Sequence, residues 1–136
     1  MTQRRTVSSG SEYESVVGYS RAVRTGPYIA VAGTTGDGDG IAAQTREALR
    51  RIEAALQQAG GSLSDVMRTR IFVTDISKWQ EVGAVHAEVF GEIGPVATMV
   101  EVSALISPDL LVEIEVDAYV DAQSVSGANL PSSSGR

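Results

Sequence analysis

The chain has 136 residues, 43% of them hydrophobic and 21% charged, which is typical of a single globular domain with its own core. Seventeen acidic residues outnumber eleven basic ones, and the net charge of −6 disfavours nucleic acid and anionic membranes as partners. The sequence contains no cysteine, which excludes disulfides, thiolate catalysis and cysteine-based zinc sites. No apolar run reaches the roughly twenty residues that span a bilayer, and none follows the basic residues at the start. We therefore expect a cytoplasmic protein.

The first part of the chain predicts two strands and a long helix. Residues 1–15 are polar and rich in Ser and Thr, and we expect a flexible lead-in there. Period-2 patterns predict strands over residues 16–23 and 28–32, separated by a Gly-Pro turn. A glycine-rich loop at 33–40, expected to be flexible, leads into a helix over 41–59, where apolar residues recur at a spacing of three and four.

The second part predicts a strand, a helix and two further strands. Residues 66–74 read as a strand with Met67, Thr69, Ile71 and Val73 on one face. A helix follows from about 78 to 92, with a cap from either Asp75 or Ser77. Strands are then predicted from 96 to 103 and from 111 to 118, and residues 122–136 are expected to form a disordered tail.

This order of elements predicts an α+β fold for a single domain over residues 16–121. It would have a mixed sheet with two helices packed on one face. The other face of such a sheet would carry alternating Val and Ile residues that need a cover. Because closed homo-oligomers are the common solution to that problem, we expect self-association.

The last two predicted strands carry carboxylates among β-branched residues. On the second of them, Glu113, Glu115 and Asp117 alternate with apolar residues and share one face. A solvated sheet face is one explanation for these charges. Glu101, on the preceding strand, could instead share a site with Glu113. Two close carboxylates would push one pKa upward and produce an acid/base pair, whereas a solvated pair on separate strands would have no such role.

Four segments in a fixed order carry a family resemblance. They are GYSRAV (18–23), AGTTG (32–36), the stretch from QTREALRR to VTDISKW (44–79), and GPVATMVEVSAL followed by VEIEVDAYV (94–120). Together they resemble the RidA (YjgF) family of reactive-intermediate deaminases. The resemblance implies a chorismate-mutase-like α+β domain that forms homotrimers, with active clefts between subunits.

The resemblance also implies an activity in metabolite repair. Members of this family hydrolyse enamines and imines, such as 2-aminoacrylate, to a keto acid and ammonia. Their arginine pairs with the substrate carboxylate through a planar fork. Here Ala97 stands at the arginine position, so we expect weak activity toward 2-aminoacrylate. In this respect the chain is similar to family subgroups that lack the arginine.

Other site residues follow from the resemblance position by position. Glu113 matches the glutamate that positions the attacking water, and it is the expected catalytic residue. The positions expected to line the substrate cleft are Tyr19 on the first predicted strand, Gly33 after the second, and Thr98 and Met99 by their backbone.

Several further residues leave two interpretations open. Arg21 lies two residues after Tyr19, so on a strand both point to one face; it is either a relocated anion anchor or a surface arginine. His86, the only histidine, is either a substrate contact or a structural residue on a partly apolar helix stripe. Trp79 is either a core residue, which we favour, or a wall of the cleft. With no cysteine and one histidine, we expect neither a metal nor another cofactor.

Two functional hypotheses follow, with a third that the charge disfavours. The first is a hydrolase of reactive imines or enamines, with Glu113 orienting water. The second is a non-catalytic trimer that binds a small metabolite or regulates a partner. The third is a nuclease or translational inhibitor, which the acidic composition counts against.

Overall fold

The computed structural model describes residues 3–121, so the predicted tail at 122–136 lies outside it. One six-stranded sheet has the order β1-β2-β3-β6-β4-β5, and only β4 and β5 pair in parallel. Three short helical turns cover Glu14–Gly18, Leu63–Asp65 and Ile76–Lys78. The main elements are β1 (Arg4–Val7), β2 (Ala22–Thr25), β3 (Tyr28–Thr34), α1 (Ile41–Gln58), β4 (Val66–Val73), α2 (Trp79–Phe90), β5 (Val96–Glu101) and β6 (Val112–Tyr119).

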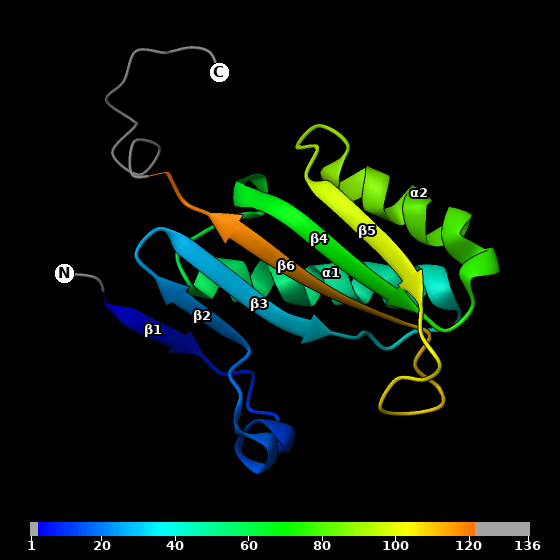
Figure 1. Cartoon of the computed structure of the whole chain (residues 1–136), viewed down its shortest axis with the longest axis horizontal. Coiled ribbons are helices and arrows are strands. Elements are labelled where there is room, and N and C mark those ends of the chain that lie inside the picture. The colour runs from blue at the N-terminus through cyan, green and yellow to red at the C-terminus, as the bar shows by residue number, and fades with distance from the viewer. Residues whose placement is uncertain (1–2, 122–136) are drawn as a thin grey trace.

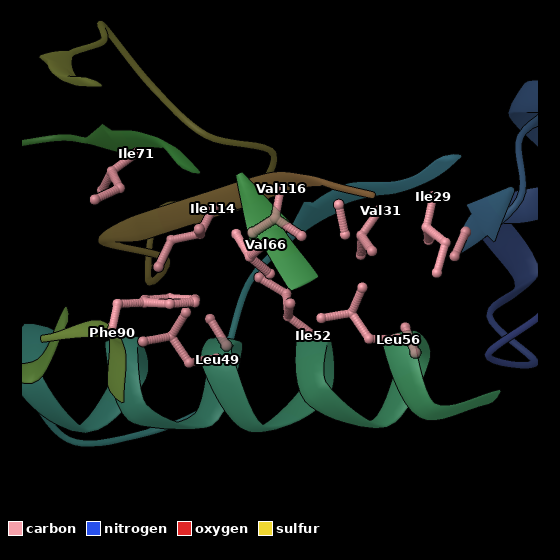
Figure 2. Packing of buried hydrophobic residues seen from close by; sticks show 14 of the residues in the cluster. Ile29, Val31, Leu49, Ile52, Leu56, Val66, Ile71, Phe90, Ile114 and Val116 are labelled. Atoms are coloured by element: carbon pink, nitrogen blue, oxygen red, sulfur yellow. The ribbon is translucent and has the colours of Figure 1, made fainter. Parts of the chain in front are cut away.

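Both long helices pack on the same face of the sheet, as Figure 1 shows, and the opposite face is open. This confirms the predicted α+β architecture with two helices on one side of a mixed sheet. Figure 2 shows the core between α1 and the strands. The periodic apolar face of α1 contributes Leu49, Ile52 and Leu56 to it, and the strands contribute residues such as Ile29, Val31, Ile71, Ile114 and Val116.

The structure corrects the prediction for the first twenty residues. Arg4–Val7 forms an edge strand that pairs antiparallel with β2, where a flexible lead-in was predicted. The strand predicted to begin at residue 16 begins at Ala22, because Glu14–Gly18 forms a helical turn instead. An edge strand with only Val7 buried leaves no alternating hydrophobic pattern, which is why the sequence did not reveal it.

A β-bulge in β4 changes which residues face the core. The register of β4 against β6 shifts between Val66 and Arg68, and Met67 is the extra residue. Val66 is therefore buried, while the side chain of Met67 is 59% exposed. The prediction that Met67 shares one face with Thr69, Ile71 and Val73 was wrong, because only the last three face the core.

The glycine-rich loop before α1 is packed against the helix, although it was expected to be flexible. A β-carbon at Gly36 would come within 2.5 Å of the carbonyl oxygen of Gln44, so only glycine fits there. Arg51 of α1 donates to the carbonyl oxygen of Thr35 (3.0 Å) and pairs with Asp37 (2.9 Å). These contacts fix the path of the chain between β3 and α1.

Replacing Ile52 with alanine should lower the free energy of unfolding by about 2–5 kcal/mol, because its side chain is 0% exposed between α1 and the sheet. Urea denaturation measures this loss. Gln57→Ala, on the exposed side of the same helix, is the control and should change stability by less than about 0.5 kcal/mol. Equal effects of the two substitutions would contradict the packing described here.

Candidate active site

The central strand β6 presents its carboxylates on the open face of the sheet. Val112 and Ile114 are fully buried against the helices, so the alternating residue Glu113 must point the other way. Glu115 and Asp117 follow on the same open face, where Arg70 of β4 donates to both at 3.2 Å. Within residues 3–121, Glu113 has no ion pair of this kind.

The carboxylate of Glu113 lies directly against Gly33 of β3. A β-carbon at position 33 would overlap Oε2 of Glu113 and come within 3.0 Å of its Cδ. The glycine thus creates the space that the half-buried carboxylate occupies. Burial raises the pKa of Glu113, the nearby charge of Glu115 raises it further, and the charge of Arg21 opposes both effects.

Arg21 and Tyr19 complete this group of residues. Nη1 of Arg21 donates to the carbonyl oxygen of Gly33 (3.0 Å) and to Oγ1 of Thr34 (2.9 Å), with a longer contact to the carbonyl oxygen of Ala32 (3.5 Å). Its guanidinium carbon lies 5.9 Å from the centre of the Tyr19 ring. The fold therefore brings together four of the residues singled out from the sequence, namely Tyr19, Arg21, Gly33 and Glu113.

An open concavity of about 690 Å³ adjoins this group on the same side of the sheet, with Tyr19 in its wall. Sequence reasoning missed three of its polar residues. Arg4 and Ser20 lie in segments whose local structure was misjudged, and Glu14 is only 9% exposed, with its carboxylate accepting from the backbone N–H and hydroxyl of Ser9. The remaining polar lining residues, Glu115 and Asp117, share the strand parity of Glu113, a signal that the sequence did contain.

Residues 97–99 lie on β5, at one edge of the sheet. Ala97 pairs in register with Thr69 of β4, and Thr98 with Arg70. Since β4 lies between β5 and β6, Ala97, Thr98 and Met99 do not join Glu113 within one chain. Their strand β5 is an edge strand, with one side of its backbone unpaired in the sheet.

Glu101 does not form a carboxylate pair with Glu113. It is paired in register with Val73, whose side chain is buried under the helices, so Glu101 belongs to the opposite face of the sheet. Its Oε1 accepts a hydrogen bond from the backbone N–H of Ile76 at 2.9 Å. The hypothesis of a shared acid/base site for Glu101 and Glu113 was therefore wrong for the single chain.

Trp79 and His86, both on α2, also lie away from Glu113. Trp79 is 53% exposed, so the favoured core interpretation was wrong. His86 shares a hydrogen bond of 2.9 Å between its Nε2 and Oγ1 of the buried Thr69, and its ring lies 4.8 Å from that of Phe90. Burial lowers the pKa of His86, which favours the neutral imidazole. These contacts give His86 a packing role between α2 and β4.

The described part of the chain has neither a metal-binding cluster nor a helix that could span a membrane. Residues 3–121 contain no cluster of three or more His, Asp or Glu side chains that could hold a metal ion. None of the helices in the same range has the length and apolar character needed to cross a membrane.

Comparison with known proteins places this geometry in a family. The family model described as Endoribonuclease L-PSP matches residues 9–120. A RutC family protein of Pyrococcus horikoshii is 40% identical over 110 residues, covering 74% of this chain and 86% of the relative. The 3-aminoacrylate deaminase RutC of Acinetobacter baylyi is 43% identical over 79 residues, covering 58% and 62%.

A solved structure extends the match to the whole fold. The crystal structure of a YjgF/YER057c/UK114 family member from Mycobacterium tuberculosis is 73% identical in sequence, with a TM-score of 0.86. The alignment covers 87% of this chain and all of that one. The chain therefore belongs to the Endoribonuclease L-PSP family, the family also known as YjgF or RidA.

Proposed function

We propose that the protein hydrolyses reactive imines or enamines in a deaminase-type reaction, with Glu113 positioning the attacking water. The observation that carries this proposal is the Glu113 carboxylate, half-buried against Gly33 and without an ion pair within residues 3–121. The relative from Acinetobacter baylyi that is named a 3-aminoacrylate deaminase supports the same class of chemistry.

The reaction needs one group that can both take and return a proton. An enamine first becomes the imine by gaining a proton on carbon and losing one from nitrogen. Water attacks the imine carbon while the Glu113 carboxylate accepts a proton from that water, and the carboxyl passes this proton to the nitrogen as the C–O bond forms and the C=N π bond breaks. Glu113 then takes the hydroxyl proton of the carbinolamine and delivers it to the amino group, so that the C–N bond breaks, ammonia leaves and a C=O bond forms. A carboxyl whose pKa lies above its usual value is better matched to such proton transfer near neutral pH than an ordinary glutamate.

The residue at position 97 bears on the choice of substrate. Ala97 offers no guanidinium to pair with a substrate carboxylate, so 2-aminoacrylate should be a poor substrate. Neutral or aromatic imines fit better, since Ala97 and the indole of Trp79 are both exposed. We place Thr98 and Met99 at the cleft through their backbone groups on the exposed edge of β5.

We further propose a homotrimer whose clefts combine the edge strand β5 of one copy with Glu113 on the central strand β6 of another. Residues 97–99 and Glu113 are separated by β4 within one chain, so a site that contains both sets requires a second copy. The open side of β5 carries exposed apolar residues that suit such a contact, with Val96 58% and Val100 42% exposed.

A second candidate function is a trimer that binds a small metabolite without converting it. Its support is the same alanine at position 97, because loss of the carboxylate-binding arginine would be tolerated where turnover is not required. The two candidates differ in whether bound ligand is consumed.

Glu113→Gln should lower imine hydrolysis by about a hundredfold or more, because an amide cannot accept the proton of water. Ammonia release from a panel of imines generated in situ measures this. Wild-type activity should fall as the pH drops through the raised pKa of Glu113, since only the carboxylate accepts a proton.

The control for that experiment is Glu53→Gln on α1, which should retain full activity. Glu113→Gln should also raise the melting temperature near neutral pH. The folded wild type favours the protonated carboxyl of Glu113, so it loses stability as the pH rises through the raised pKa of this group, whereas the glutamine variant does not. Ligand binding by the wild type without any turnover would favour the binding protein instead.

Gly33→Ala should reduce activity at least about tenfold, because its methyl group would occupy the place of the Glu113 carboxylate. A double-mutant cycle provides the control. If the effect acts through Glu113, adding Gly33→Ala to Glu113→Gln should cost little further activity. Fully additive losses would show that Gly33 acts in another way.

Sedimentation equilibrium should give a mass three times that of the 14.3 kDa chain. Val100→Lys should shift the mass toward the monomer, because it places a charge on the exposed side of β5. Gln57→Lys, on the exposed side of α1, is the matched control and should leave the mass unchanged. A monomeric wild type would contradict the shared cleft.

A further inference from the structure

We propose that Arg21 is a positioning residue that fixes the irregular part of β3 and balances the negative charge of Glu113. This inference deepens the proposed function, because it takes Glu113 as the reactive group. It replaces the idea of Arg21 as a free anion anchor with a role inside the fold.

The first argument is the place where Arg21 binds. Regular pairing of β3 with β6 is interrupted between Val31 and Thr34. Nη1 of Arg21 donates to oxygens of all three residues 32, 33 and 34, so a single nitrogen spans the irregular segment. Where a strand loses regular pairing, its backbone N–H and C=O groups lack their partners on the neighbouring strand, so they need hydrogen bonds from elsewhere.

The second argument is that Arg21 is itself held in place. Its backbone N–H donates to the carbonyl oxygen of Val7 in β1 (2.8 Å), and its own carbonyl oxygen accepts from the N–H of Ala32 (2.9 Å). Both its main chain and its guanidinium are thus tied to neighbouring strands. A side chain whose Nη1 is restrained in this way is suited to hold a wall of the site.

The third argument connects this restraint to Glu113. The carbonyl oxygen of Gly33 accepts one of the Arg21 hydrogen bonds, and the α-carbon of the same glycine faces the Glu113 carboxylate. A movement of Gly33 would therefore change both the depth and the direction of that carboxylate. Arg21 acts on Glu113 through Gly33, not by direct contact.

The fourth argument is electrostatic. Within residues 3–121, Arg21 forms no ion pair within 4.0 Å, so its charge is not cancelled by a bound carboxylate, whereas Arg70 is paired with Glu115. Burial and the charge of Glu115 raise the pKa of Glu113, and the charge of Arg21 opposes them. Hydrogen bonds from Ser9 lower the pKa of Glu14, and the charge of Arg21 adds to that effect. Arg21 is thus the cation that offsets burial at Glu113.

The experiment compares Arg21→Gln with Arg5→Gln in the full chain. Arg5 is a suitable control because it also donates to a main-chain carbonyl oxygen, that of Gln58, but on the helix side of the sheet. Carboxyl carbon NMR should show a higher pKa of Glu113 in Arg21→Gln and no change in Arg5→Gln. Amide hydrogen exchange at Gly33 should be faster only in Arg21→Gln.

Activity gives a separate readout. The acidic limb of the pH profile should move upward in Arg21→Gln, so that kcat/KM falls at least about threefold more at about pH 6 than at about pH 9. Equal losses at both pH values, confined to substrates with a carboxylate, would instead identify Arg21 as a substrate anchor and overturn the proposal. An unchanged titration of Glu113 in folded Arg21→Gln would also overturn it.

The NMR readout separates this inference from the proposed function. If Glu113 titrates as expected but no imine is hydrolysed by the wild type, the proposed function fails and the role of Arg21 stands. If Arg21→Gln does not fold, Arg21→Lys decides, since it keeps the charge but lacks the planar fork of donors. Amide hydrogen exchange at Gly33 should be faster in Arg21→Lys than in the wild type. An unchanged exchange rate in this variant would overturn the proposal.

Discussion

The contact between a carboxylate and a glycine determines how this site is built. Glu113 can be half-buried on the open face only because Gly33 has no side chain at that point. The hydrophobic core fixes its direction, since Val112 and Ile114 are fully buried on either side of it in β6. The apolar alternation of the strand therefore orients the carboxylate, and the glycine sets how deeply it lies.

The start of β6 is fixed by a buried amide on α1. Nε2 of Gln44 donates to the carbonyl oxygen of Asp109 (3.0 Å), and its Oε1 accepts from the N–H of Leu111 (2.9 Å). Because Gln44 is only 5% exposed, leaving either group unpaired would cost free energy, so the clamp is maintained in the folded state. The helix thus holds the strand two residues before Glu113.

The sequence predicted the features that depend on periodicity and missed those that depend on pairing. Strand parity correctly placed Glu113, Glu115 and Asp117 on one face, and α1 was found from its spacing. The face to which Glu101 belongs depends on the parallel register of β5 with β4, which no local pattern encodes. For the same reason Met67 was misplaced, since a bulge changes parity without changing the composition of the strand.

The charges of the open face are arranged in a way that sets Glu113 apart. Glu115 and Asp117 lie within 3.2 Å of Arg70, and Asp117 lies 3.9 Å from Arg68. Carboxylates that are already paired can be covered by another surface at a lower cost than bare ones. Among the described residues, Glu113 forms no such ion pair and is balanced only by the longer-range charge of Arg21. The open face therefore combines carboxylates whose charge is neutralised by arginine with one carboxylate that has no such partner among the described residues.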